Sequence, residues 1–174
     1  SLLAHSRIAV INRDESDLYT RALPILVRKK YVTYGIRRDA VVTKKTYSFK
    51  TSLPGEFNRY NILAALAATC EGLGVEKKSA FKTVASFLGV PGRMETVVTK
   101  PFRVIIDFAH TPNAIEKALA TARILTKNRL IHVFGSAGLR DHLKRPMMGR
   151  ASAAHADIMV LTEEDYRTED VNRI

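Results

Sequence analysis

The segment from Val104 to Ala120 constrains the fold of this chain more than any other part of the sequence. An apolar, β-branched stretch ends abruptly at Asp107, and a short polar segment leads into a helical pattern. Thr111 suits the N-cap of that helix, and Pro112 suits its first position, where the missing backbone N–H costs nothing. Apolar residues then recur at helical spacing, at Ile115, Ala118, Leu119, Ala122 and Leu125. The pattern predicts a strand, a loop and a helix in succession, as in an α/β domain.

Asp107 and His110 stand where the expected strand gives way to the loop. Open parallel sheets bind ligands at the carboxyl ends of their strands. We therefore treat both residues as candidate ligand-binding groups, against the alternative that Asp107 only caps the turn that follows it.

The composition indicates one large or two small globular domains, because 46% of the 174 residues are hydrophobic. No apolar run approaches the length of a bilayer span and the first residues lack a signal-peptide pattern, so we expect a cytoplasmic protein without a membrane partner. The single cysteine, Cys70, excludes an intrachain disulfide. It lies on the apolar face of an expected helix, where a small buried hydrophobe is a better interpretation than a nucleophile.

The formal net charge of +11 raises the question of nucleic-acid binding. Only 7% of the residues are aromatic, tryptophan is absent, and no nucleic-acid-binding motif occurs. The basic residues are also spread along the chain, in the groups Arg28–Lys30, Arg37–Arg38, Lys44–Lys45, Lys77–Lys78 and Lys144–Arg145. A positive potential suits small substrates that carry phosphate or carboxylate groups equally well, so we expect no nucleic-acid partner.

The strongest break in the sequence, from Gly89 to Gly92, is the best candidate for a hinge between two domains. Before it, the pattern predicts helices over residues 15–27, 58–73 and 77–88 and strands over residues 8–12, 31–36 and 47–53. After it, strands are expected near residues 102–107, 130–134 and 157–162, spaced as in βαβ units. Right-handed crossovers would bring the polar loops after these three strands to one edge of a sheet. Three such units make an unusually small sheet, so we expect the chain to be a piece of a larger protein.

Two asparagines and one arginine lie where a nucleotide could be bound. Asn58 and Asn61 are three residues apart at a helix start, and a carboxamide offers a donor and an acceptor that suit the edge of adenine. An asparagine at such a position is more often a cap. Arg93 follows the hinge and could reach a nucleotide, although a surface ion pair with Glu95 fits the local sequence better.

The stretch from Gly135 to Asp141 is rich in glycine and follows an expected strand, but it is neither a dinucleotide fingerprint nor a P-loop. Arg140, Lys144 and Arg145 could bind carboxylate or phosphate, arginine doing so through two parallel hydrogen bonds. The alternative is a solvated basic face.

Taken in order, these segments resemble the Mur ligase family, and within it the UDP-N-acetylmuramoyl-tripeptide synthetase type. The matching pieces run through nearly the whole chain in the family's order: Phe57–Asn61, Gly92–Glu95, Asp107–Pro112, Arg140–Pro146 and Thr162–Glu169. Each piece is modest alone, and the ordered set is specific.

The resemblance implies an α/β chain of two parts. Residues 1–92 would form the end of a P-loop-type central ATPase domain, and residues 93–174 the first part of a Rossmann-like C-terminal domain. The implied reaction is ATP-dependent amide formation through an acyl phosphate, which adds diaminopimelate or lysine as the third residue to UDP-N-acetylmuramoyl-L-alanyl-D-glutamate in peptidoglycan synthesis. ATP and Mg²⁺ would take part, and the partners would be small-molecule substrates, with no obligate protein partner. The P-loop, the catalytic residues and the metal ligands would lie upstream of this chain.

The resemblance also assigns the ATP-binding residues. Asn58 and Asn61 would contact adenine. Arg93 and Asp107 would hold the adenine-ribose part of ATP, with His110 beside them.

The incoming amino acid would be recognised by Arg140 and by the loop that runs Glu164, Asp165, Tyr166, Arg167. Lys144 and Arg145 would supply further phosphate or carboxylate contacts. Diaminopimelate-adding members of the family carry Asp-Asn-Pro-Arg in this loop, so only the arginine is retained, and loss of the proline loosens the loop. The retained arginine favours a substrate with a distal carboxylate, and hence diaminopimelate over lysine. The glycine-rich loop departs from the family as well, at Ala137, Leu139 and His142.

Two other interpretations stay open. The chain could belong to a related ligase, similar to cyanophycin synthetase or folylpolyglutamate synthetase, which would be expected to lack the pair Arg140 and Arg167. It could also be a non-catalytic nucleotide-binding module.

We expect the chain alone neither to hydrolyse ATP nor to form an amide bond, because it contains no phosphate-cradling glycine-lysine loop and no constellation of magnesium-binding carboxylates. Phosphate release from ATP and Mg²⁺ is measured with the nucleotide-dipeptide substrate and diaminopimelate present and absent. Substrate-dependent release would contradict the expectation.

Overall fold

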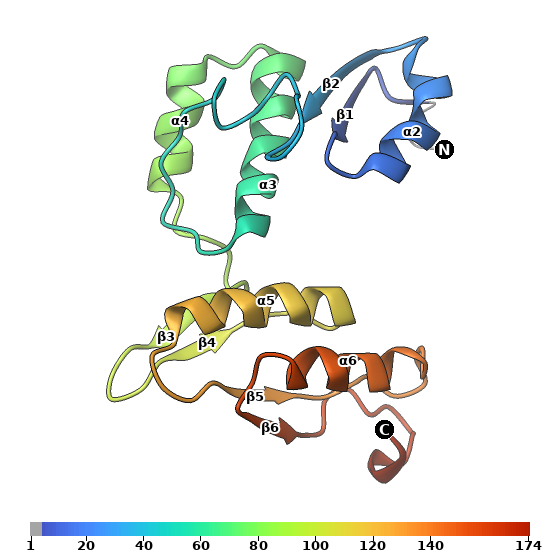
Figure 1. Ribbon diagram of the computed structural model, residues 1–174, viewed down its shortest axis with the longest axis vertical. Coiled ribbons are helices and arrows are strands. Elements are labelled where there is room, and N and C mark those ends of the chain that lie inside the picture. Colours follow the sequence, from blue (N-terminus) through green and yellow to red (C-terminus); the bar gives the residue numbers. More distant parts are fainter. Residues whose placement is uncertain (1–4) are drawn as a thin grey trace. The chain divides into compact units, whose positions relative to one another are not determined.

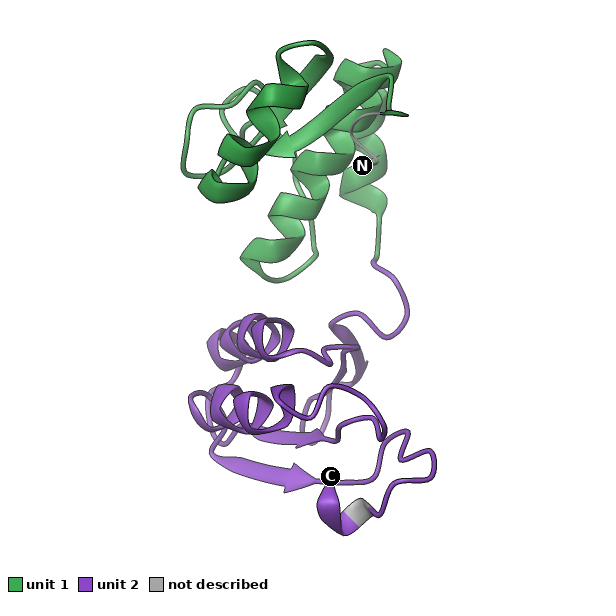
Figure 2. Ribbon diagram, turned by 90° about the vertical axis from the view of Figure 1, so that its right-hand side faces the viewer, with its two compact units in different colours: residues 1–88 green, residues 89–174 purple. Residues whose placement is uncertain are grey.

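Figure 1 shows a computed structural model of the protein, which describes residues 5–174. The chain divides into two compact units, residues 1–88 and residues 89–174, which Figure 2 distinguishes by colour. Both units combine helices with short strands, so the expected α/β class is confirmed. None of the helices described is long and apolar enough to cross a bilayer.

In its described residues, the first unit combines two short parallel strands with several helical segments. In chain order these are β1 (Ile8–Asn12), α2 (Ser16–Leu26), β2 (Lys30–Tyr34), α3 (Glu56–Leu66), the π-helical segment η1 (Ala67–Gly72) and α4 (Lys77–Ser86). Strands β1 and β2 pair in parallel, with Ile8 opposite Lys30. The single helix expected over residues 58–73 therefore begins slightly earlier and changes from α- to π-helical after Leu66.

Alternate residues of β1 face two hydrophobic clusters, as the two-residue period of a strand requires. Ala9 and Ile11 pack with residues of α2. Ile8 and Val10 contact the larger cluster, whose buried members are Val32, Val42, Tyr47, Ile62, Leu63, Leu66, Ala67 and Cys70. Cys70 is thus a buried apolar residue, as the sequence predicts.

The strand expected over residues 47–53 is wrong, because this segment is irregular. The alternating apolar residues of this segment nevertheless point inward. Tyr47 is buried in the larger cluster, and Phe49 and Leu53 pack against it. Alternating side chains indicate which residues point inward, and an extended segment can satisfy that pattern without pairing to a neighbouring strand.

Asp14, two residues after β1, anchors the segment that follows β2. Its carboxylate accepts the backbone N–H groups of Ile36, Arg37 and Arg38 at 2.7, 3.0 and 2.8 Å. The hydroxyl of Tyr60 donates to it as well, at 2.8 Å. Burial alone would raise the pKa of Asp14, but these hydrogen bonds outweigh burial and lower the pKa. Burial and the contact with Asp14 together raise the pKa of Tyr60 to about 12.

The second unit contains four strands and two longer helices. In chain order these are β3 (Glu95–Val98), β4 (Val104–Ile106), α5 (Pro112–Leu125), β5 (Ile131–Phe134), α6 (Lys144–Ala153), β6 (Ile158–Leu161) and the 3₁₀ turn η2 (Val171–Arg173). Strands β4, β5 and β6 match the three expected strands. Strand β3 was not expected, and β4 pairs with it in antiparallel fashion. The parallel arrangement expected of all three strands is found for β5 and β6 alone among the described residues.

Helix α5 begins as the sequence predicts. The side chain of Thr111 accepts the backbone N–H of Ala114 at 3.3 Å, and Pro112 occupies the first helical turn. Ile115 and Leu119 of α5 then pack with Met148 of α6 in the core of this unit. The cap fixes where the helix begins, and it therefore fixes the loop that joins β4 to α5.

We expect Asp14→Asn to lower the free energy of unfolding by about 1.5–3 kcal/mol at neutral pH, because hydrogen bonds to a charged group contribute about that much. The folded-state pKa of Asp14 lies below its unfolded value of 3.8. The loss is therefore fully present above pH 3.8 and disappears as the pH falls through the folded-state pKa.

Urea unfolding of the two proteins at a series of pH values measures this difference. Asp39→Asn is the control, since Asp39 is exposed and makes no hydrogen bond among residues 5–174. An equal loss in both variants would contradict the role of Asp14.

Candidate functional site

Asp107 directly follows β4 and reaches back toward the residues before β3. Its Oδ2 accepts the backbone N–H of Met94 at 2.8 Å. Met94 is buried and has a φ of 48°, in the left-handed region that side chains rarely adopt. The Oδ1 atom of Asp107 accepts no hydrogen bond within the described part of the chain. The carboxylate thus holds one segment in place and leaves one oxygen for a ligand, and it does not cap the turn that follows it.

Arg93 lies over an aromatic ring and forms no ion pair with Glu95. Its guanidinium carbon is 4.5 Å from the centre of the Phe108 ring, a cation–π contact. Glu95 instead accepts the backbone N–H of Gly92 at 2.7 Å. Because the Phe108 side chain is exposed, Arg93 and Phe108 together form a surface that is both cationic and aromatic.

His110 joins this group from the same loop. Its ring lies 5.0 Å from that of Phe108, edge to face, and its Nδ1 is 3.0 Å from the carbonyl oxygen of Phe108. Lys144, at the start of α6, donates to the carbonyl oxygen of His110 at 3.2 Å. The structure therefore brings Arg93, Asp107, His110 and Lys144 together around Phe108, a residue that the sequence did not single out.

Asn58 and Asn61 lie in the first turns of α3, in the first unit. The Nδ2 of Asn58 donates to the carbonyl oxygen of Pro54 at 2.7 Å, and the Nδ2 of Asn61 lies 3.5 Å from the Oδ1 of Asn58. The two side chains therefore share one face of the helix. The Oδ1 of Asn61 accepts no hydrogen bond from the residues that the structure describes.

The loops after β5 and β6 pack against each other through their backbones. The N–H of Gly138 donates to the carbonyl oxygen of Asp165 at 2.7 Å. A Cβ atom at Gly138 would clash with the carbonyl group of Tyr166, and one at Gly135 would clash with the carbonyl oxygen of Thr162. Only glycine permits this close approach. The two loops expected to bind the amino acid are therefore in contact.

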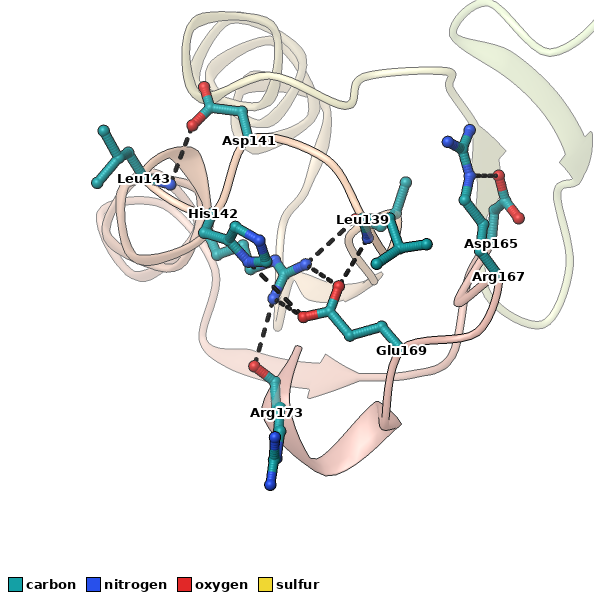
Figure 3. Close-up of polar contacts among 10 residues, drawn as sticks. Leu139, Asp141, His142, Leu143, Asp165, Arg167, Glu169 and Arg173 are labelled. Atoms are coloured by element: carbon teal, nitrogen blue, oxygen red, sulfur yellow. Dashed lines mark hydrogen bonds and ion pairs between the residues drawn. The ribbon is translucent and has the colours of Figure 1, made fainter.

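Glu169 is the centre of the polar contacts between these loops (Figure 3). Its two oxygens lie 2.8 and 2.7 Å from the terminal nitrogens of Arg145, and its Oε2 accepts the backbone N–H of Leu139 at 2.7 Å. His142 Nδ1 is 3.6 Å away. The side chains of Arg145 and Glu169 are only 10% and 13% exposed. The hydrogen bonds from Arg145 and Leu139 lower the pKa of Glu169 to about 2.

The five residues expected to contact the amino acid, Arg140 and residues 164–167, are all exposed. Arg167 Nε pairs with the carboxylate of Asp165 at 3.0 Å, on the side of the loop that faces away from Glu169 (Figure 3). Arg140 makes no hydrogen bond or ion pair within residues 5–174. Its guanidinium is therefore available to an anion, whereas both terminal nitrogens of Arg145 are engaged with Glu169.

A cavity of about 720 Å³ lies beside these loops in the second unit. Phe134, Met148 and Leu161 form part of its apolar wall, and Ser136 and Tyr166 add polar atoms. The hydroxyl of Ser136 is buried and has no hydrogen-bond partner in the part of the chain that the structure describes. Sequence reasoning missed Ser136 and the role of Glu169. No local sequence pattern shows that Ser136 is buried or that Glu169 pairs with Arg145, 24 residues away. No cluster of three or more metal-binding side chains occurs among the described residues.

Comparison with known proteins finds that the chain is similar to members of the Mur ligase family. Residues 92–174 match the family model of the Mur ligase glutamate ligase domain. The UDP-N-acetylmuramoyl-L-alanyl-D-glutamate–2,6-diaminopimelate ligase of Aquifex aeolicus is 37% identical, in an alignment that covers 97% of this chain and 38% of that protein. The chain thus spans less than two fifths of the length of this relative.

Two solved structures are also similar. A UDP-N-acetylmuramoyl-L-alanyl-D-glutamate–2,6-diaminopimelate ligase is 31% identical, with a TM-score of 0.54, over 97% of this chain and 39% of that one. The UDP-N-acetylmuramate–alanine ligase of Thermotoga maritima is 26% identical, with a TM-score of 0.63, over 80% of this chain and 36% of that one.

We expect Gly138→Ala to lower the free energy of unfolding by about 1–3 kcal/mol, since the added methyl group must displace the backbone of the neighbouring loop. Gly149→Ala is the matched control, because nothing lies within 4 Å of its Cβ position in α6. Alanine there should stabilise the helix by up to about 1 kcal/mol. Thermal or urea unfolding measures both changes. A Gly138→Ala protein as stable as the wild type would contradict the close packing of the two loops.

Proposed function

Because this chain belongs to the Mur ligase family, we propose that it forms part of an ATP-dependent ligase that adds the third residue to UDP-N-acetylmuramoyl-L-alanyl-D-glutamate. Residues 1–92 would be the end of the central ATPase domain, and residues 93–174 the first part of the amino-acid-binding domain. The observation that carries this proposal is the 37% identity, over nearly the whole chain, to a ligase named for 2,6-diaminopimelate. We propose that the complete ligase is cytoplasmic and that its partners are its small-molecule substrates.

The proposed reaction has two steps. A carboxylate oxygen of the D-glutamyl residue attacks the γ-phosphorus of ATP, the bond to the β-phosphate oxygen breaks, and ADP leaves. The amino group of the incoming amino acid then attacks the acyl carbon, the carbon–oxygen bond to phosphate breaks, and the amine loses a proton. Such chemistry depends on positioning and charge neutralisation more than on a protein nucleophile. The described residues contain no group of three or more metal-binding side chains. We propose, as the family resemblance implies, that parts outside this chain bind Mg²⁺ and transfer the phosphate.

The residues around Phe108 suit the adenosine end of ATP. The Oδ1 of Asp107 accepts no hydrogen bond within residues 5–174, so it can accept one from a ribose hydroxyl. Arg93 and the exposed Phe108 ring offer a cationic and aromatic surface to the nucleoside, and His110 lies beside them. We propose that Asn58 and Asn61 of α3 contact the adenine edge, for which the free Oδ1 of Asn61 is an acceptor.

The loops after β5 and β6 suit the amino acid. The guanidinium of Arg140 is free of hydrogen bonds and ion pairs to the residues that the structure describes. Arg167 and Asp165 form an exposed pair that a substrate with both carboxylate and ammonium groups can contact. Glu164 and Tyr166 complete this loop. Arg145 is committed to Glu169, so we assign it to holding the loops rather than to an anion, while Lys144 remains near the carbonyl group of His110.

In the complete ligase we expect Arg167→Lys to weaken the use of diaminopimelate more than that of lysine, because lysine has no distal carboxylate and an ammonium group cannot form the two parallel hydrogen bonds of a guanidinium. Loss of one charge-assisted hydrogen bond should cost about 1.5–3 kcal/mol, or about a tenfold to hundredfold fall in kcat/KM.

The measurement is the ratio of kcat/KM for the two amino acids in both proteins. Arg103→Lys, at an exposed arginine outside these loops, is the control. A ratio that Arg167→Lys leaves unchanged would rule out contact between Arg167 and the distal carboxylate.

A further inference from the structure

We propose that Glu169 is a positioning residue that fixes the loops of Arg140 and Arg167 relative to each other for binding of the distal carboxylate of the amino acid. The proposal rests on the function proposed above. It differs from a direct substrate contact, because the carboxylate of Glu169 is largely buried and is occupied by groups of the protein.

Glu169 joins three segments through one carboxylate. It lies in the loop after β6, two residues beyond Arg167. It accepts the backbone N–H of Leu139, the residue immediately before Arg140, at 2.7 Å. It also holds the guanidinium of Arg145 in α6 through two hydrogen bonds, and Arg145 in turn lies 3.4 Å from the carbonyl oxygen of Ala137. Both candidate amino-acid-binding loops and the helix between their strands are thus tied to this side chain.

The backbone on both sides of the contact is strained. Leu139 has a φ of 53° and Arg167 a φ of 57°, in the left-handed region that a side chain disfavours. Such conformations persist where the surrounding contacts determine them. At Leu139 the determining contact is the hydrogen bond to Glu169 itself. Loss of that contact would let Leu139 relax, and the direction of the adjacent Arg140 would change with it.

Stabilisation by the ion pair between Arg145 and Glu169 does not by itself explain why the two loops are joined in this way. A buried pair of charges often contributes little net stability compared with apolar residues of the same size. The backbone contact adds a geometric constraint, because the carboxylate must meet the guanidinium of Arg145 and the N–H of Leu139 at once. Gly138 reinforces the constraint, since its own N–H donates to the carbonyl oxygen of Asp165 at 2.7 Å.

The test uses the full 174-residue chain and three proteins: wild type, Glu169→Gln and Glu163→Gln. Glu163 is the matched control, because it lies in the same loop, is exposed and makes no hydrogen bond or ion pair among residues 5–174. Amide hydrogen exchange at Gly138 and Leu139 reports whether the loops stay together. The side-chain Nε–H signals of Arg140 and Arg167, followed by NMR during titration with 2,6-diaminopimelate or with lysine, report binding.

We expect Glu169→Gln to stay folded, to speed exchange at Leu139 by about tenfold or more, and to weaken binding of diaminopimelate by about tenfold while changing that of lysine little. Glu163→Gln should change neither. Should Glu169→Gln fail to fold, Arg145→Lys takes its place, because it keeps the charge and removes the paired hydrogen bonds.

Exchange at the wild-type rate in a folded variant, or an unchanged preference for diaminopimelate over lysine, would overturn the proposal. A wild-type chain that does not distinguish the two amino acids would contradict the substrate in the proposed function. The exchange rate at Leu139 would then still decide whether Glu169 holds the two loops together.

Discussion

In both units, partly buried carboxylates hold irregular segments of the chain by accepting their backbone N–H groups. Asp14 accepts three consecutive N–H groups of the segment after β2, and Glu169 accepts that of Leu139 in the glycine-rich loop. The irregular parts of this chain carry most of the candidate binding residues. Among them, the loops after β5 and β6 depend on Glu169 for their conformation as well as on the strands that they follow.

The two carboxylates gain their stability from different partners. Asp14 relies on neutral donors, the backbone and a tyrosine hydroxyl, and burial works against its charge. Glu169 has a guanidinium as its main partner, and its pKa falls to about 2. Both stay ionised at any pH near neutrality, so the loops that they hold should keep their conformation across that range.

The sequence predicted well where local chemistry decides the structure. Thr111 and Pro112 identify the start of α5 because a cap and a fixed φ act within one helical turn. It failed over residues 47–53, because inward-facing side chains do not require a partner strand. Strand β3 was missed because its four residues, Glu95 to Val98, show no alternation of polar and apolar side chains. The pair of Arg145 and Glu169 could not be found, since its partners are 24 residues apart and meet through the packing of helix α6 against the loop after β6.

The contact between Gly138 and the loop after β6 determines which positions of the two loops can change in sequence. Gly138 meets the carbonyl group of Tyr166, not its side chain, and a clash there would arise whatever residue stood at position 166. The contact therefore constrains position 138 closely and position 166 very little. The side chain at position 166 can therefore change while the two loops keep their contact, whereas the glycine at position 138 cannot be replaced without moving the backbone opposite it.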